Sequence, residues 1–481
     1  MLETKIELNP IDIAIQLFKD RVFDFITVFN GKMHKKQNEA LLVLTDKETE
    51  ELVYGGAAGG AKSWTGCVWL MFMCLTYPGT KWFIGRQELK RITESTLITF
   101  FKVAKLYGVT SFKFNGQKNF IVFENDSRID LLELKYLPSD PLYERFGSTE
   151  YTGGWIEEGG EINFGAYDVL RTRIGRHYND FYGLVAKLFI TCNPKKNWLY
   201  TDFYKPFTKG LLKGIKKFLQ ALVQDNPFIE NGYIERLRRT KDKAKRERLL
   251  NANWDYDDNP YALCDYDSIV ALFENDHVVE ASNKYITADI ARFGSDVARI
   301  GVWHGWVLKE VISFDVSKTT EIQAAIDALR AKYQIPKNNC IADEDGVGGG
   351  VVDNCGILGF KNNARPFEEN VSGNLRDVPE YENLQTQCLF KLADKVNDNS
   401  IYIEADISPS EQEMLINEIA KIERDPEITR KLALVKKAKI KEDIGRSPDY
   451  RDMILMRVYF DIKPKSIKHS TALNANDLGL F

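Results

Sequence analysis

The chain has 481 residues, more than one hydrophobic core usually supports, and its length therefore predicts two domains. Its hydrophobic fraction of 44% and charged fraction of 28% are those of a soluble globular protein. Its net charge of −4 argues against a surface that is basic throughout, so binding to nucleic acid would require local basic patches.

The first part of the chain follows an α/β pattern. Residues 1 to about 50 resemble helices, and from Leu52 to about Pro206 short apolar strands alternate with loops and helical stretches. The longest apolar run, Cys67 to Leu75, is too short to cross a bilayer, so we expect no membrane partner. Strands are predicted at 52–54, 81–84, 119–123 and 187–191. We assign residues 1–210 to this first domain.

The pattern changes after residue 210. A charged, helix-like run extends from Arg236 to Arg248, and polar residues typical of turns follow at 255–260. We expect residues 211–280 to form a linker or lid. A second α/β domain is predicted over 281–464, with strands at 285–290, 297–303, 307–314 and 339–342. Residues 465–481 show little periodicity and are expected to form a flexible tail.

A glycine-rich loop joins the first predicted strand to an apolar helix. Backbone N–H groups of such a loop, together with the start of the helix, can surround phosphate oxygens. Lys62 is expected to contact the β- and γ-phosphates of ATP, and Ser63 to bind Mg²⁺. Ala61 replaces the usual glycine before the lysine, and a plain glycine-rich turn is the alternative interpretation. The predicted ATP-binding residues of the loop are Gly56, Gly59, Gly60, Ala61, Lys62 and Ser63.

Two consecutive acids follow the apolar residues of 153–156. Glu157 occupies the position of an acid that supports the Mg²⁺ shell, and Glu158 is the candidate base that polarises the attacking water. The pair predicts ATP hydrolysis, with a merely charged strand end as the alternative.

Other polar residues fit the same site. Gln37 lies upstream of the loop, where some ATPases read the adenine base, although a solvated glutamine is the plainer interpretation. Thr191 and Asn193 end a later strand, where a polar group can sense phosphate and couple hydrolysis to movement, or simply form an Asn-Pro turn. The candidates for an arginine finger are Arg86, Arg173 and Arg176.

Acids in the second domain predict a metal site. Asp289 lies within an apolar strand, where an unpaired acid is costly, and Asp343 ends another strand. Asp449 and Asp452 open an apolar helix, where Asp449 has an alternative role as N-cap and Asp452 as a surface acid. Converging acids of this kind hold two Mg²⁺ ions for cleavage of a phosphodiester, and Mn²⁺ is a substitute.

In their order and spacing these motifs resemble the large subunit of tailed-bacteriophage terminases, from about Gln37 to Phe460. The motifs are 55–63, 153–158, 191–194, Asp289 with 294–296, Asp343 with 346–350, and 447–452. The resemblance implies an α/β chain with an N-terminal P-loop ATPase domain of the RecA/ASCE-like type and a C-terminal RNase H-like nuclease domain.

The resemblance also implies roles for individual residues. Glu158 is expected to be the catalytic base, and the nuclease metal ligands are expected to be Asp289, Asp343 and Asp449, with Asp452 as a rival for the third place. Glu157 departs from the family's usual aspartate.

The implied function is a DNA-packaging motor that threads double-stranded DNA into a procapsid and cuts concatemers. The implied partners are a portal protein, a small terminase subunit and further copies of the chain in a ring. The implied location is the host cell cytoplasm. Two alternatives remain: an ATP-dependent assembly factor without nuclease activity, and a repair-type ATPase-nuclease.

Overall fold

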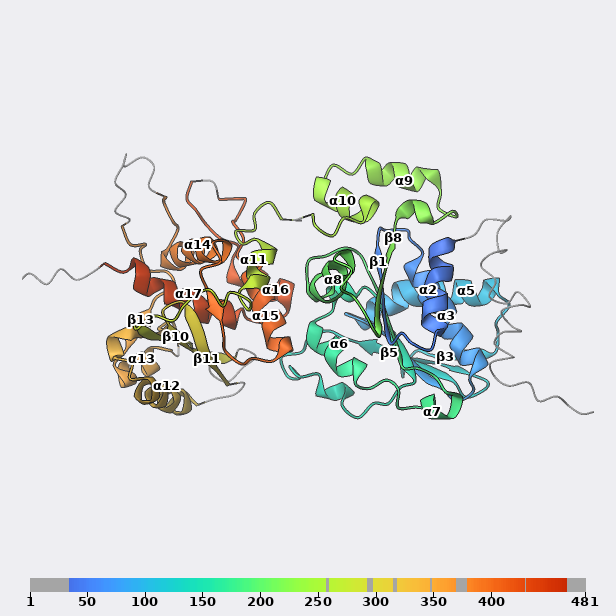
Figure 1. Ribbon diagram of the computed structural model, residues 1–481, viewed down its shortest axis with the longest axis horizontal. Coiled ribbons are helices and arrows are strands. Elements are labelled where there is room, and N and C mark those ends of the chain that lie inside the picture. The colour runs from blue at the N-terminus through green and yellow to red at the C-terminus, as the bar shows by residue number, and fades with distance from the viewer. Residues whose placement is uncertain are drawn as a thin grey trace, which may run out of the picture. The chain divides into compact units, whose positions relative to one another are not determined.

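The computed structural model describes residues 34–256, 259–291, 297–314, 318–346, 348–368, 379–428 and 430–464. The chain divides into two compact units (Figure 1). The first comprises Met1–Pro260 with Pro409–Glu413, and the second comprises Tyr261–Ser408 with Met414–Phe481. Some predictions fall wholly or partly on residues outside the described ranges: residues 1–33, the turn at 255–260, the motif residues 294–296 and Val347, and the tail 465–481.

The first unit contains an eight-stranded sheet with the order β3-β4-β5-β2-β6-β7-β1-β8. The six strands from β5 to β8 in this order are parallel, and a hairpin of β3 and β4 adds an antiparallel edge. The strands are β1 (Glu51–Gly56), β2 (Lys81–Arg86), β3 (Phe112–Asn115), β4 (Phe120–Phe123), β5 (Arg128–Glu133), β6 (Gly153–Ile156), β7 (Lys187–Cys192) and β8 (Lys216–Ala221).

Helices cover both faces of this sheet (Figure 1). The central helix α3 is apolar almost all round and packs with α2 and α5 against the side chains of β1, β2, β6 and β7, as expected for a helix buried on every side. The helices are α2 (Lys35–Thr45), α3 (Lys62–Thr76), α4 (Leu89–Arg91), α5 (Leu97–Leu106), α6 (Phe164–Arg171), α7 (Asn179–Tyr182), α8 (Lys205–Thr208), α9 (Asn231–Arg238) and α10 (Lys243–Asn251), and a π-helical turn, η1 (Ile92–Thr96), links α4 to α5.

The second unit contains a six-stranded sheet with the order β13-β12-β9-β10-β11-β14. The first three strands along the chain pair antiparallel, and β12 then adds parallel to β9 on the other side. This is the RNase H-like arrangement that the resemblance implies. The strands are β9 (Lys284–Asp289), β10 (Ala298–His304), β11 (Val307–Phe314), β12 (Cys340–Asp343), β13 (Leu358–Phe360) and β14 (Tyr402–Ile403).

The two faces of this second sheet carry different helices. Ile286 and Ala288 of β9 belong to the hydrophobic core between this sheet and α12. Because side chains alternate along a strand, Thr287 and Asp289 face the opposite side of the sheet, where α17 packs. The helices are α11 (Tyr266–Ala271), α12 (Thr319–Tyr333), α13 (Gly348–Cys355), α14 (Leu384–Asn397), α15 (Pro409–Ile419), α16 (Lys437–Ile444) and α17 (Asp449–Ile462). The first five residues of α15, Pro409–Glu413, belong to the first unit.

The predicted fold class is confirmed, while the predicted boundaries differ from the two units. Residues 211–260 are not a separate linker, because β8 pairs along its whole length with β1. The predicted helical run 236–248 is divided between α9 and α10, since Asp242 caps a new helix through a hydrogen bond from the N–H of Lys245. Residues 261–280 belong to the second unit.

Candidate functional sites

The glycine-rich loop lies between β1 and α3 and passes close to β8. A Cβ atom on Gly56 would lie 2.0 Å from the carbonyl oxygen of Ala221, so only glycine fits there. Ala61 has φ 56° and ψ 26°, the left-handed conformation that usually selects glycine. This position therefore carries a backbone cost of about 1–2 kcal/mol for alanine.

Lys62 folds back onto its own loop. Its buried Nζ donates to the carbonyl oxygens of Gly56 and Ala57 at 3.2 and 2.6 Å, and to Oδ1 of Asn193 at 3.1 Å. Burial lowers the pKa of Lys62, and the charge of Glu158 opposes this shift. Phosphate oxygens are stronger acceptors for an ammonium group than these neutral carbonyls, so the lysine is suited to exchange them for a phosphate.

Asn193 connects Lys62 to Glu158. Its Nδ2 donates to both carboxylate oxygens of Glu158, at 3.3 and 3.1 Å, while its Oδ1 accepts from the lysine. Burial raises the pKa of Glu158, and Lys62 opposes this rise. Thr191 is also buried, but its Oγ1 accepts from Nε1 of Trp155 at 3.0 Å. Of the two coupling candidates, Asn193 is therefore the one that contacts both charged groups.

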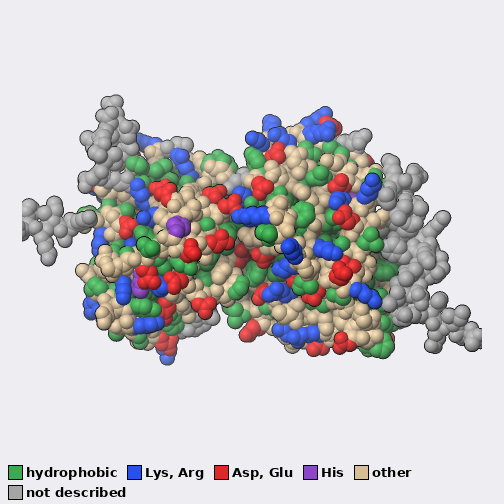
Figure 2. All heavy atoms as spheres, viewed as in Figure 1, with side chains coloured by type: hydrophobic (Ala, Val, Ile, Leu, Met, Phe, Trp, Pro, Cys, Tyr) green, Lys and Arg blue, Asp and Glu red, His purple; other side chains and the backbone are tan. Residues whose placement is uncertain are grey.

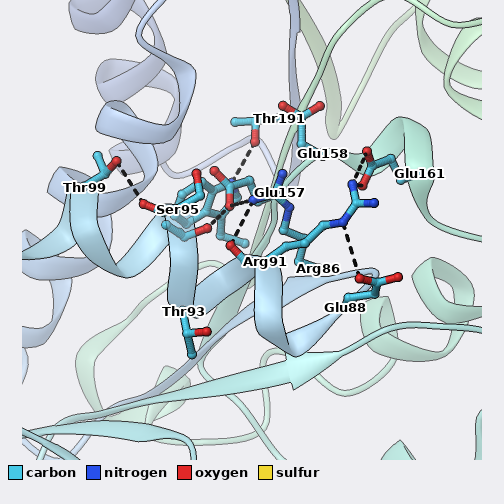
Figure 3. Close-up of polar contacts among 12 residues, drawn as sticks. Arg86, Glu88, Arg91, Thr93, Ser95, Thr99, Glu157, Glu158, Glu161 and Thr191 are labelled. Atoms are coloured by element: carbon cyan, nitrogen blue, oxygen red, sulfur yellow. Dashed lines mark hydrogen bonds and ion pairs between the residues drawn. The ribbon is translucent and has the colours of Figure 1, made fainter. Parts of the chain in front are cut away.

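Glu157 lies apart from Glu158 and bonds with residues of the neighbouring strand and turn (Figure 3). Its Oε2 accepts from Oγ1 of Thr96 and lies 3.5 Å from Nη1 of Arg86. Because Glu158 has φ 53°, the backbone turns sharply after Glu157, and Glu157 does not line the cavity at the loop. The predicted contribution of Glu157 to the Mg²⁺ shell has no support from this position.

The predicted arginine fingers also lie away from the cavity. Arg86 is engaged by Glu157. Arg173 donates to the carbonyl oxygen of Gly147 at 2.7 Å, and its own carbonyl oxygen accepts from the N–H of Tyr151. Tyr151 lies just before β6, whereas Glu158 follows the other end of this strand. Arg176 bonds to Tyr151 at that same end. None of the three lines the cavity of its own subunit.

A cavity of about 800 Å³ opens beside the loop, large enough for a nucleotide. Gln37 lines it, as predicted, and its buried Nε2 donates to the carbonyl oxygen of Ala61 at 3.2 Å. Further lining residues include Ser63, Lys62, Glu158, Asn193, Trp64, Asn226, Phe228, Tyr233 and Arg236.

The last four of these residues were missed by the sequence interpretation. They belong to the segment predicted to be a linker or lid, where the basic run from Arg236 to Arg248 is interpreted as a contact to DNA phosphates or as a solvated helix, and not as part of the ATP site. Aromatic residues beside an arginine were the available signal, but only the pairing of β8 with β1 brings them to the loop.

Helix α10 and the segment before α9 hold the tip of the loop. The N–H of Ala58 donates to the carbonyl oxygen of Leu249 in α10 at 2.9 Å. Nδ2 of Asn226 donates to the carbonyl oxygen of Gly59 at 2.6 Å. Side chains of both helices pack around Ala57, so the loop is in direct contact with α9 and α10.

The predicted nuclease acids meet at one edge of the second sheet. Asp289 is the last residue of β9 and Asp343 is the last residue of β12. These two strands are parallel, and Ala288 lies opposite Ala342. The two acids, each one residue further along, therefore lie next to each other. Asp449 and Asp452 lie in the first turn of α17. Asp449 is the first helical residue and its Oδ2 accepts from the N–H of Val297 at 3.1 Å, so it is not the N-cap.

The electrostatics of this cluster fit a bound cation. Burial raises the pKa of Asp289 well above its usual range, and the charges of Asp452, Asp449 and Asp343 add to the rise. Burial also raises the pKa of Asp343 to about 6 and that of Asp449 to about 6. Carboxylates that repel one another in this way are stabilised by a divalent ion, and their oxygens are the ligands that Mg²⁺ prefers.

Two basic residues contact the rival ligand, Asp452. Nζ of Lys437 lies 2.5 Å from its Oδ2, and Arg451 donates to its Oδ1 at 2.9 and 2.7 Å. Although burial opposes it, these cations lower the pKa of Asp452. In the described part of the chain, no group of three or more His, Cys, Asp and Glu side chains is arranged to hold a metal ion. The assignment of metal ligands stays a prediction, with Asp449 less engaged by cations than Asp452.

Comparisons with known proteins give one family and several solved structures. Residues 53–259 match the family model described as "Terminase large subunit, T4likevirus-type, N-terminal". No curated protein sequence matches the chain. A large terminase from a thermophilic bacteriophage, solved with ADP, is 13% identical, covers 88% of this chain and 98% of its own, and has a TM-score of 0.40. The nuclease domain of the large terminase subunit of bacterial virus Sf6 is 19% identical, covers 42% of this chain and 100% of its own, and has a TM-score of 0.37.

Proposed function

We propose that the chain is a terminase large subunit, whose N-terminal family model matches residues 53–259, and that it is the ATP-driven motor that packages viral double-stranded DNA and cuts it. The observation that carries the proposal is the group of Lys62, Asn193 and Glu158 in one cavity beside the phosphate-binding loop.

In the ATPase half, Lys62 exchanges the carbonyl oxygens of Gly56 and Ala57 for phosphate oxygens when ATP binds. Ser63, at the start of α3, would hold the accompanying Mg²⁺, whose charge would neutralise the phosphates. Glu158 then accepts a proton from the attacking water, for which its raised pKa is favourable. Asn193 contacts both Lys62 and Glu158, so the loss of the γ-phosphate alters a hydrogen bond that leads to β7.

In the nuclease half, Asp289, Asp343 and Asp449 hold Mg²⁺ or Mn²⁺, with Asp452 as the rival for the third place. When bound there, such ions would supply Lewis-acid chemistry toward a phosphodiester and a water molecule. The chain's own contribution is to place carboxylates from two parallel strands and one helix at a single edge of the sheet.

Exposed basic side chains gather over α9 and α10 (Figure 2). They are Arg236, Arg238, Arg239, Lys241, Lys243 and Lys245. Basic residues on one surface attract a DNA backbone without reading its sequence. This surface is the part of the first unit that we assign to the DNA substrate, which is a concatemer in the proposed function.

The proposal includes partners and a location. A portal protein, a small terminase subunit and a homo-oligomeric ring on the procapsid complete the motor, which works in the host cell cytoplasm. In the described residues no helix is both long enough and apolar enough to cross a membrane.

The two activities are tested by exchanging one residue in each half. Lys62→Ala should abolish ATP turnover and spare Mn²⁺-dependent cleavage of naked DNA, whereas Asp289→Ala should do the opposite. Surviving ATPase activity in Lys62→Ala would contradict the first site. Absence of cleavage in the unaltered protein would favour an assembly factor, and ATP-dependent separation of DNA strands would favour a repair-type enzyme.

A further inference from the structure

The helix that carries two of the nuclease acids begins without a cap of its own. α17 starts at Asp449, and the residue before it is Pro448, which makes no side-chain cap. The first N–H groups of a helix have no partner within the helix and are usually bonded by a Ser, Thr, Asp or Asn side chain at the N-cap. At α17 this acceptor has to come from another part of the chain.

Glu418 of α15 supplies the acceptor. Its Oε2 accepts a hydrogen bond from the backbone N–H of Arg451, the third residue of α17, at 2.9 Å. The side chain of Glu418 is fully buried. A carboxylate at this end of a helix also interacts favourably with the helix dipole. Glu418 therefore has the role of an N-cap that belongs to a different helix.

Arg446 holds Glu418 in place. Its Nη1 pairs with Oε1 of Glu418, and its Nη2 donates to the carbonyl oxygen of Met414 in the same helix at 2.9 Å. Arg446 is itself buried and lies two residues before Pro448. Glu418 thus connects α15 to the segment that leads into α17 at two points: Arg446, before Pro448, and the N–H of Arg451, after it.

The position of the two acids of α17 depends on these contacts of Glu418 with Arg446 and Arg451. Asp449 and Asp452 lie on either side of Arg451 in the turn that Glu418 caps, and metal ligands need to be held within about 0.5 Å of the productive geometry. We propose that Glu418 and Arg446 form a buried clamp that positions the acids of α17 for metal-dependent DNA cleavage. The proposal rests on the proposed nuclease function.

Glu418 acts as a positioning residue and not as a further metal ligand. Both of its carboxylate oxygens already accept from donors, one from Arg446 and the other from the N–H of Arg451. A metal could bind Glu418 only after these bonds were broken, which would release the start of α17.

The test measures the clamp and its effect on cleavage in the full-length protein. In Glu418→Ala, the amide of Arg451 should exchange with deuterium at least about tenfold faster, and kcat for Mn²⁺-dependent cleavage should fall by about 100-fold at saturating Mn²⁺. The double variant Glu418→Gln with Arg446→Met keeps an acceptor for the N–H and leaves no buried charge unpaired. It should restore both readouts to near those of the unaltered protein, although each single change is damaging.

A matched control lies at the other end of the same helix. Asp461 pairs with Arg457 at 2.8 Å in the last turn of α17, so Asp461→Asn removes an ion pair from the helix without touching its start. It should leave the amide exchange of Arg451 and cleavage unchanged. The thermal unfolding transition of the second unit, which contains all three residues, reports in each variant that this unit has folded.

Three outcomes would overturn the clamp. They are unchanged amide exchange in Glu418→Ala, lost protection with unaltered cleavage, and a double variant that folds but stays as damaged as the singles. The last result would make Glu418 itself a metal or substrate ligand. If the unaltered protein does not cleave DNA, the proposed nuclease fails, and the exchange of the Arg451 amide still decides whether the clamp exists.

Discussion

Ala61 and Glu158 are two non-glycine residues in the left-handed conformation, with φ of 56° and 53°. One immediately precedes Lys62 and the other is the proposed base, so both strained residues adjoin the phosphate site. Backbone strain of this kind persists only where the surrounding structure enforces it. At Glu158 the conformation separates its carboxylate from that of Glu157. At Ala61 it lets the loop turn into α3.

Replacement of Ala61 by glycine should relieve this strain. Because the left-handed conformation costs alanine more than glycine, we expect Ala61→Gly to stabilise the first unit by about 1 kcal/mol. That gain corresponds to a rise of about 2–4 °C in its melting temperature. The measurement is urea or thermal unfolding. Ala58→Gly is the control in the same loop, since Ala58 has no positive φ and glycine there should be destabilising. Equal effects of the two changes would contradict the strain at Ala61.

Helix α10 is the element that connects the loop to the surface proposed for DNA. Its residue Leu249 accepts the N–H of Ala58 at 2.9 Å, and its exposed side carries basic residues. The helix begins at an N-cap, Asp242, whose Oδ1 accepts from the N–H of Lys245 at 2.9 Å. The placement of Leu249 against the loop therefore depends on a cap two turns away.

Loss of this cap should weaken nucleotide binding. Asp242→Ala removes an N-cap worth about 1 kcal/mol, so the Michaelis constant for ATP should rise by up to about fivefold, with DNA cleavage unchanged. Asp265→Ala is the matched control, because Asp265 caps α11 in the second unit through the N–H of Ser268. A similar rise in both variants would show that the effect is not specific to α10.

At the scale of the whole molecule, each unit has its own sheet, its own core and its own site. The core around α3 belongs to the first unit, and the core between β9 and α12 belongs to the second. A ligand that binds one folded unit stabilises that unit by mass action, whatever the other unit does.

Nucleotide should therefore stabilise the first unit alone. At a concentration 100 times its Kd, a non-hydrolysable ATP analogue with Mg²⁺ adds about 2.7 kcal/mol, or roughly 5–10 °C in the melting temperature of a unit of this size. Calorimetry should show this shift in one transition. Asp289→Asn should retain the shift and Lys62→Ala should lose it. A shift that survives in Lys62→Ala would contradict the nucleotide site.

Much of the candidate site could be predicted from local sequence. The phosphate-binding loop is a contiguous run between a strand and a helix, and its chemistry resides in its own N–H groups and Lys62. Asp289 and Asp343 were predictable as neighbours because both end buried strands, and the ends of parallel strands meet at one edge. Asn193 was predictable for the same reason, since it follows the last residue of β7.

Only the tertiary structure decided which side chains face the site. Glu157 and Glu158 are adjacent and both were predicted to face the nucleotide, but the left-handed backbone at Glu158 directs their side chains differently. The pairing of β8 with β1 brings Tyr233 and Arg236 to the nucleotide cavity. Glu418 caps a helix that starts 31 residues later in the chain, at Asp449. Sequence determined the chemistry of contiguous motifs, whereas contacts between distant segments depend on packing of the whole unit, which no local pattern contains.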